Sequence, residues 1–169
     1  LQVDRGPAAD LWPLYALVGQ SQQTVAAGSS LGAMSFRVHN YAAAAWSGLI
    51  PYEVVLSADS LITGGDRVIH SGTLSLRAGI DPLATYGALI SDLTLPADVA
   101  AGRWFLGVRL LVSDADTGNN VTGGDDVDWV NVTCPAPPIP WVGTPADGAE
   151  CVPRDDATLI WGDLGAGYT

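Results

Sequence analysis

Lysine is absent from the 169-residue sequence, and arginine supplies all 7 basic residues against 18 Asp and Glu. Without lysine, the chain cannot form a Schiff base or supply the lysine of a phosphate-binding loop. The formal net charge of −11 repels phosphate backbones and anionic headgroups. We therefore expect no nucleic-acid partner and no binding to acidic membranes.

Conventional catalytic groups are also scarce. His39 and His70 are the available bases, the glutamates are limited to Glu53 and Glu150, and no nucleophile elbow, zinc-protease helix or glycine-rich phosphate loop occurs. His39 continues the polar side of an alternating segment, where a solvent-facing role is expected. The aspartates could form a pair for glycoside hydrolysis, but no spacing singles one out. The sequence favours a protein that is not an enzyme.

Long apolar runs are missing as well. No run approaches the roughly 20 residues that span a bilayer, so membrane insertion is not expected. The opening LQVDRGPAAD lacks the basic start and apolar centre of a signal peptide. Because the chain begins at Leu1 rather than Met, we interpret it as a processed or excised product.

Short segments of alternating apolar and polar residues are abundant. In LGAMSFRVHN, residues 31–40, Met34, Phe36 and Val38 fall on one side, and RWFLGVRLLV, residues 103–112, has one continuous apolar face. Further strands are expected at residues 11–18, 52–57, 68–76, 89–95 and 128–133. The YAAAAW segment, residues 41–46, is the one helix-like stretch, and it is too short for a stable helix.

About seven strands joined by turns rich in Gly, Asp, Asn and Pro predict an all-β protein, an antiparallel β-sandwich. A closed barrel is the alternative. The residues expected to fill the core are apolar members of the alternating segments: Leu11, Met34, Phe36, Val38, Tyr52, Val54, Leu56, Leu74, Leu93, Trp104, Leu106, Val108 and Leu110.

An ordered set of short motifs runs from Ala9 to about Thr133. An Asp-Leu start in ADLWPLYAL is followed by Val-x-Asn in FRVHN, LSAD, LRAG, the Leu-Pro and Gly pair of LPADVAAG, and SDADTGNN. In this order the motifs resemble the bacterial cell-adhesion-related domain, CARDB. Members of that family often carry glutamates before the final Asn-Asn, where this chain has Asp114, Asp116 and Thr117.

The resemblance implies an immunoglobulin-like sandwich at residues 10–133, preceded by a tail or strand at residues 1–9. It also implies a secreted or surface-displayed protein, in which such domains serve as repeats or accessory modules. We therefore expect a noncatalytic adhesion module that makes contacts with proteins or surfaces, located outside the cell or on its surface.

The composition changes after residue 133. CPAPPIP, residues 134–140, has the proline content of a stiff linker. Residues 141–169 resemble the opening of a fibronectin type III-like domain, on the motif set Pro145, Asp147, Gly148, Leu159, Trp161, Gly165, Ala166 and Tyr168. Such a fragment buries too little surface to fold alone. Either the chain continues beyond Thr169, or another chain completes these strands.

Strand completion between chains leads to an alternative function, a subunit of an extracellular filament that self-associates through β-strand edges. A minor alternative is a carbohydrate-binding module, because Trp12, Trp46, Trp129 and Trp141 could stack on the rings of a glycan. Asn-x-Thr sequons at Asn120 and Asn131 matter where the source glycosylates secreted chains.

The two cysteines, Cys134 and Cys151, flank the linker and the start of the second unit. A disulfide between them would stabilise the fold by about 3 kcal/mol and would indicate an oxidising compartment. The alternatives are two thiols, or a partner for Cys151 beyond the end of this chain. No Cys-x-x-Cys spacing occurs, so zinc is not expected.

Two aspartate-containing loops are candidate calcium sites, and no other cofactor is expected. One, residues 52–66, carries Asp59 and Asp66, and the other, residues 113–120, carries Asp114, Asp116, Asn119 and Asn120. Carboxylate and amide oxygens in glycine-containing loops suit calcium, although neither loop has the EF-hand spacing. In the alternative interpretation, the aspartates bond to their own backbone and form turns.

Overall fold

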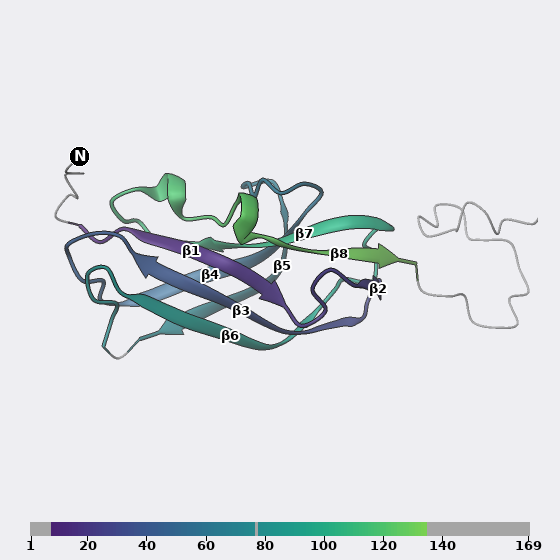
Figure 1. Cartoon of the computed structure of the whole chain (residues 1–169), viewed down its shortest axis with the longest axis horizontal. Coiled ribbons are helices and arrows are strands. Elements are labelled where there is room, and N and C mark those ends of the chain that lie inside the picture. The colour runs from purple at the N-terminus through teal and green to yellow at the C-terminus, as the bar shows by residue number, and fades with distance from the viewer. Residues whose placement is uncertain (1–7, 77, 135–169) are drawn as a thin grey trace, which may run out of the picture.

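The computed structural model describes residues 8–76 and 78–134, and within them eight strands form two stacked sheets (Figure 1). No α-helix occurs in these residues. The elements are β1 (Leu11–Val18), β2 (Thr24–Ala26), β3 (Ser30–Asn40), β4 (Leu49–Ser57), β5 (Arg67–Ser75), β6 (Thr85–Thr94), β7 (Gly102–Leu110), two 3₁₀ turns η1 (Thr117–Asn119) and η2 (Gly124–Asp126), and β8 (Asp128–Thr133).

One sheet has the order β1-β3-β6, and the other has the order β2-β8-β7-β4-β5. The predicted sandwich is therefore confirmed over the barrel. Its pairing is antiparallel with one exception, since β2 runs parallel to β8 with Thr24 opposite Asn131. After β1 the chain turns at residues 19–23 and pairs briefly with the other sheet, which produces the parallel edge.

The predicted strands are all present, and β1 and β8 have the predicted bounds. The strand that was not predicted is β2, which has 3 residues. No helix forms at residues 41–46. Instead, Trp46 pairs with Ile80 through two backbone hydrogen bonds, of 2.9 and 3.0 Å.

The core lies between the two sheets and contains the predicted side chains. Phe36, Leu11, Met34 and Leu106 are at most 1% exposed, and each such side chain contributes about 1.5–3 kcal/mol by its burial. Two members of the predicted core, Leu74 and Trp104, are partly buried and pack against its margin.

An irregularity in β1 sets the direction of its side chains. The pairing of β1 with β3 shifts register between Leu14 and Leu17, and Tyr15 has a φ of 55°, which is rare for an aromatic residue. This bulge keeps Ala16 and Val18 in the core, while Tyr15 and Leu17 are exposed.

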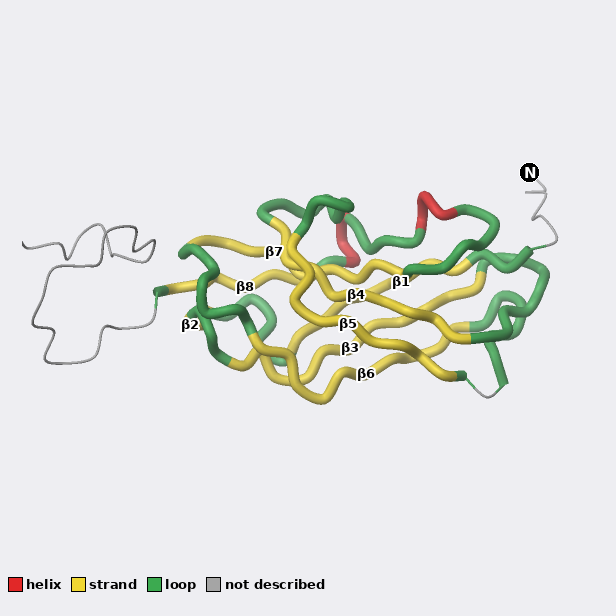
Figure 2. Tube along the Cα trace, turned by 180° about the vertical axis from the view of Figure 1, so that it is seen from behind, coloured by secondary structure: helices red, strands yellow, loops and turns green. Residues whose placement is uncertain are grey.

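The connections between strands are distributed unevenly. The long connection from β7 to β8, which contains both 3₁₀ turns, runs along the β1 side of the sandwich, on the same side as the β4–β5 loop (Figures 1 and 2). Most of the predicted linker and all of the fibronectin-like segment at residues 141–169 lie outside the described residues. Within the described ranges, no helix has the length and apolar character needed to cross a bilayer.

Candidate functional site

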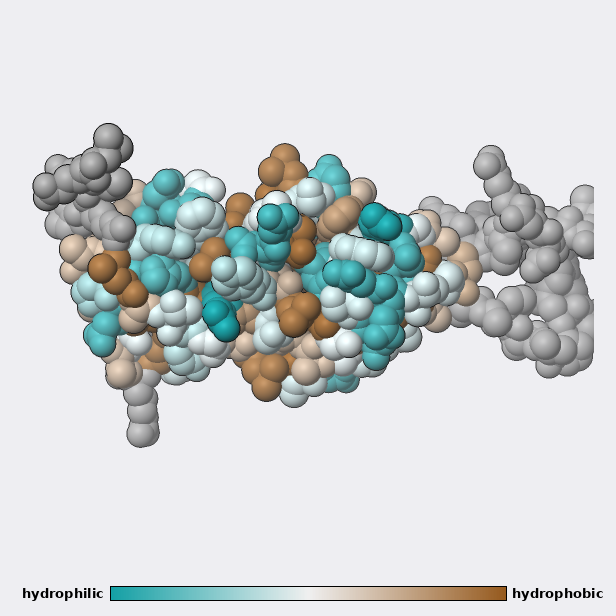
Figure 3. Space-filling view, in the orientation of Figure 1, coloured by the Kyte–Doolittle hydropathy of each residue, from teal (hydrophilic) through white to brown (hydrophobic). Residues whose placement is uncertain are grey.

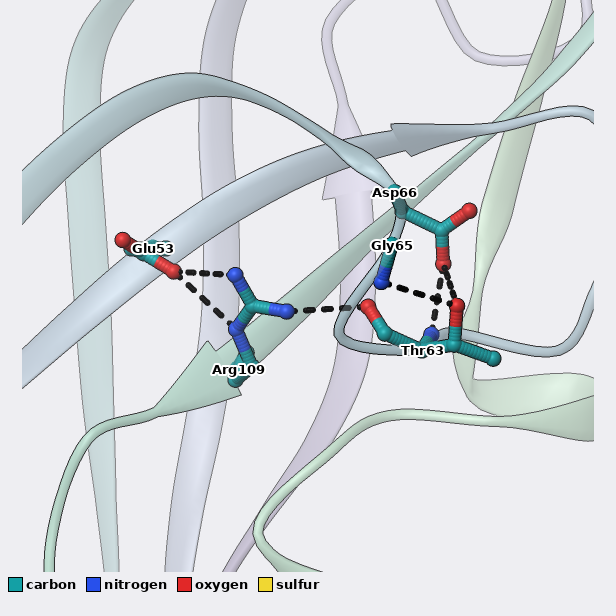
Figure 4. Close-up of polar contacts among 5 residues, drawn as sticks. All are labelled: Glu53, Thr63, Gly65, Asp66 and Arg109. Atoms are coloured by element: carbon teal, nitrogen blue, oxygen red, sulfur yellow. Dashed lines mark hydrogen bonds and ion pairs between the residues drawn. The ribbon is translucent and has the colours of Figure 1, made fainter.

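The loop between β4 and β5, residues 58–66, is closed by its own side chains. Asp59 Oδ1 accepts a hydrogen bond from the backbone N–H of Leu61 at 2.8 Å. Asp66 Oδ2 accepts from the N–H of Thr63 at 2.5 Å and from its hydroxyl at 3.1 Å (Figure 4). These are the contacts by which Asp and Thr stabilise turns. Both carboxylates therefore have a structural role in this loop.

Arg109 on β7 ties the same loop to the sheet (Figure 4). Its Nε and Nη2 donate to Oε2 of Glu53 on β4, at 3.0 and 2.5 Å, and its Nη1 donates to the carbonyl oxygen of Thr63 at 2.9 Å. The side chains of Arg109 and Glu53 are 18% and 19% exposed, so solvent and salt screen this pair weakly. The arginine holds the loop against β4 and β7.

Part of the outer face of the five-stranded sheet is covered at Gly107. Ile62 from the β4–β5 loop is 4% exposed and Thr122 from the β7–β8 connection is fully buried. The Thr122 hydroxyl accepts a hydrogen bond from the N–H of Val108 at 2.8 Å. A Cβ at Gly107 would overlap both side chains. This part of the sheet is therefore not available to a partner.

A second polar cluster lies where β1 begins. Asp114 accepts hydrogen bonds from the N–H of Leu11 at 2.7 Å and from Nδ2 of Asn120 at 3.1 Å. Asp10 accepts one from Nδ2 of Asn119 at 2.8 Å. Chiefly burial, and to a smaller extent the negative charge of Asp10, raises the pKa of Asp114 above its ordinary value. The cluster thus holds two carboxylates in each other's field.

The amide oxygens of two asparagines in this cluster are buried. Oδ1 of Asn119 and Oδ1 of Asn120 are buried and have no hydrogen-bond partner among the described residues. A buried polar atom without a partner costs about 1–3 kcal/mol. Because Asn120 is 3% exposed, its sequon is also inaccessible in the folded domain.

The structure divides the four predicted calcium ligands between two connections. Asp59 and Asp66 close the β4–β5 loop, while Asp114 contacts β1 and Asp116 caps η1 by accepting from the N–H of Gly118 at 2.9 Å. Within residues 8–76 and 78–134, no group of three or more His, Cys, Asp or Glu is arranged to hold a metal ion. Sequence reasoning did not include Asp10 in this set.

The predicted disulfide joins one cysteine inside the described residues to one outside them. Cys134 directly follows β8, is half-buried and forms no disulfide within the described residues. Cys151 lies outside them, so the pairing of these cysteines stays a prediction.

The described tryptophans lie on different elements. Trp12 on β1 contacts the Tyr41 ring at a centroid distance of 5.3 Å, and Trp129 on β8 lies under the Arg103 guanidinium at 4.2 Å. Trp46 packs against the core. These three tryptophans come from three separate parts of the chain, and Trp141 lies outside the described residues.

Both histidines lie on strands. His39 on β3 shares a 2.7 Å hydrogen bond with the Thr85 hydroxyl, and its ring lies 4.1 Å from that of Tyr41. His70 on β5 lies 6.0 Å from the Tyr52 ring. Neither imidazole hydrogen-bonds to a carboxylate within the part of the chain that the structure describes.

The outer face of the three-stranded sheet carries exposed apolar side chains beside a cavity of about 630 Å³. Leu17, Ser35 and Leu89 form one cross-strand row, in which the two leucines are 53% and 72% exposed. Tyr15 is 59% exposed and has the Arg37 guanidinium 5.6 Å above its ring. Figure 3 shows apolar residues scattered among polar ones on this side of the molecule.

The exposed apolar side chains of β1 have a signal in the sequence. LWPLYALV, residues 11–18, is apolar at every position. Because successive side chains of a strand point to opposite faces, such a run must place apolar groups outside as well as inside. The exposure of Tyr15 and Leu17 follows from this pattern.

Comparison with known proteins gives structural matches alone. No protein-family model matches the chain, and no curated protein is significantly similar to it. The CARDB domain of a Pyrococcus furiosus protein, solved in complex with di-metal ions, has 13% identity and a TM-score of 0.49, covering 77% of this chain and 98% of that domain. This match agrees with the resemblance predicted from the sequence motifs, and it concerns the fold.

A β-glucosidase from Listeria innocua gives a weaker match. In complex with glucose it has 13% identity and a TM-score of 0.40, and in complex with isofagomine 14% and 0.41. Each match covers 73% of this chain and 16% of the glucosidase. The similarity is thus to a small part of that enzyme.

Proposed function

We propose that this chain is a noncatalytic structural module of an extracellular or surface-displayed bacterial protein, and that it contacts a protein partner through the outer face of β1, β3 and β6. The observation that supports this most is the pair of exposed leucines, Leu17 and Leu89, beside Tyr15 on that face. The two leucines lie in one cross-strand row with Ser35 between them, and exposed apolar area rimmed by polar residues marks interaction surfaces.

The charge of the chain indicates the kind of partner. A net charge of −11 favours association with neutral or basic proteins and opposes association between copies. Tyr15 and Arg37 also belong to the residue types enriched at protein interfaces. A basic partner with an apolar centre therefore fits this face.

Two matched substitutions test the face. Leu89→Lys places a charge on the proposed surface, while Leu61→Lys does so on the β4–β5 loop, at a leucine that is 67% exposed against 72% for Leu89. The full chain and both variants would be immobilised and exposed to the envelope fraction of the producing bacterium. We expect Leu89→Lys to abolish capture of a specific protein that the wild type and Leu61→Lys retain. Equal capture by all three chains would reject the proposal for this face.

Assembly into a filament by strand addition is the second candidate. Among the described strands, β5 and β6 each pair on one side only, and β6, TYGALISDLT, contains no proline and a single charge, Asp92. Long edges with little charge are templates for strand pairing. Sedimentation at low and high salt distinguishes the two candidates. Salt screens the repulsion between copies and should promote self-association, whereas it should weaken binding of a basic partner.

A further inference from the structure

Asn40 shows how this fold treats a buried amide. It is fully buried, and its Oδ1 accepts hydrogen bonds from the N–H groups of Asp10 and Ala42, at 3.2 and 3.1 Å. Its Nδ2 donates to the carbonyl oxygens of Ala44 and Ile80, at 2.7 and 3.2 Å. Donor and acceptor are both satisfied, as is usual for buried polar groups.

Asn119 and Asn120, close to the same end of the sandwich, differ from Asn40. Each amide touches a carboxylate through its nitrogen, Asn119 at Asp10 and Asn120 at Asp114, while its oxygen is buried without a partner in the described residues. Asn120 is 3% exposed, so bulk water does not solvate this oxygen. Each unpaired oxygen therefore belongs to an amide whose nitrogen contacts a carboxylate.

Each arginine that the structure describes has a partner outside this acidic cluster. Among the residues that the structure describes, Arg67 pairs with Asp98 and Arg109 with Glu53. Arg37 lies over Tyr15 and Arg103 over Trp129. Among the described residues, the Asp10 and Asp114 carboxylates thus have no arginine that pairs with them.

A half-turn of each amide about its terminal bond exchanges oxygen and nitrogen. The oxygen of Asn120 would then face Asp114 Oδ1 and the carbonyl oxygen of Val112, which now lie 3.1 and 3.3 Å from its nitrogen. The oxygen of Asn119 would face the carboxylate of Asp10. Oxygens converging in this way repel one another unless a cation lies between them.

We propose that Asp10, Asp114, Asn119 and Asn120 form a binding site for one calcium ion, with the Val112 carbonyl oxygen as a further ligand. The donors are all oxygen atoms, which suit a hard cation, and calcium takes about six to eight of them at about 2.3–2.6 Å. No histidine or cysteine belongs to the set, which disfavours zinc and other softer metals. Water completes the coordination shell.

The site would join the two sheets. Asp10 precedes β1 of the three-stranded sheet, whereas Asp114 and η1 follow β7 of the five-stranded sheet (Figure 1). The same segments are already linked by hydrogen bonds from the N–H of Leu11 to Asp114 and from the N–H of Ala115 to the carbonyl oxygen of Ala9, at 2.7 and 2.9 Å. Calcium would strengthen this end of the sandwich independently of any partner on the outer face.

The test is titration of the metal-free full chain with calcium chloride, followed by calorimetry, thermal melting and NMR. We expect one calcium per chain, and a rise in Tm of about 10 °C when free calcium exceeds its Kd about a hundredfold. The side-chain NH₂ signals of Asn119 and Asn120 should shift with the same midpoint. A titration without binding, or binding that leaves these signals unmoved, would overturn the proposal.

Matched variants locate the site. Asp114→Asn and Asp10→Asn each remove one charged ligand and should weaken calcium binding at least about tenfold, while Asp59→Asn, in the β4–β5 loop, should bind as the wild type does. Asp10→Asn serves if Asp114→Asn fails to fold, because within this cluster of described residues the carboxylate of Asp10 accepts a hydrogen bond from Asn119 alone. Equal weakening in Asp10→Asn and Asp59→Asn would indicate diffuse binding to the acidic surface and reject the site.

Discussion

The covering of β7 at Gly107 can be tested by adding a single methyl group. A Cβ at this position overlaps the side chains of Ile62 and Thr122, and overpacking of this kind costs about 1–3 kcal/mol. Replacing a strand glycine by alanine otherwise gains about 0.5–1 kcal/mol. Gly107→Ala should therefore reduce the free energy of unfolding by about 1–2 kcal/mol. Gly87 on β6 is a matched control, because a Cβ there meets no atom within 4 Å, and Gly87→Ala should be neutral or stabilising.

A double-mutant cycle identifies the source of the loss. Ile62→Ala alone should cost about 2–4 kcal/mol, because it removes a side chain that is 4% exposed. In that background the added methyl group at Gly107 no longer meets Ile62, and its cost should fall by at least about 1 kcal/mol. Urea denaturation of the wild type, the two single variants and the double variant measures the free energy of unfolding of each. Additive costs, or an equal loss in Gly87→Ala, would refute the direct contact between this loop and the sheet.

Two further expectations concern charged groups. Arg109→Gln should lower the free energy of unfolding in urea by about 1–3 kcal/mol, because the half-buried Glu53 loses its cation and the Thr63 carbonyl oxygen loses its donor. Arg67→Gln, which breaks an exposed ion pair, should change the free energy of unfolding little. Equal losses in the two variants would contradict this argument. Asp114, whose pKa is raised in the fold, binds protons more tightly when folded than when unfolded. With a chelator present, the free energy of unfolding should therefore fall as the pH rises from the ordinary pKa of an aspartate through the raised pKa of Asp114. Asp114→Asn should lack this fall, so pH profiles that run parallel in the two proteins would contradict the expectation.

The strands were predictable because their signal is local. Alternation at residues 31–40 and 103–112 gave β3 and β7 and placed Met34, Phe36 and Val108 in the core, where each is at most 1% exposed. β2 was not predicted because a segment of 3 residues is too short to show alternation of apolar and polar side chains, and because its partner β8 is remote in sequence. A short edge strand of this kind is determined by tertiary pairing and not by its own composition.

The candidate calcium site was only partly predictable for a related reason. The sequence identified Asp114, Asn119 and Asn120 as members of one oxygen-rich loop, since their spacing is short. Asp10 is 109 positions from Asn119, to which it is hydrogen-bonded, and no local pattern joins the two. Asp59 and Asp66 had a similar spacing signal, but their oxygens accept hydrogen bonds within their own turn. Spacing in the sequence therefore indicates which oxygens can lie close together, and the fold determines which of them already accept hydrogen bonds within their own loop.

The exposed face of β1, β3 and β6 follows from the topology as much as from composition. The β4–β5 loop and the β7–β8 connection join strands of the five-stranded sheet, and they return across its outer face, where Ile62 and Thr122 are buried. No two consecutive strands of the chain are neighbours in the three-stranded sheet, so each connection leaves it for the other sheet or crosses between them. Within residues 8–76 and 78–134, a sheet built from such connections receives no covering loop of its own. Leu17 and Leu89 therefore stay exposed, although leucines facing the other way on the same strands are expected to be buried.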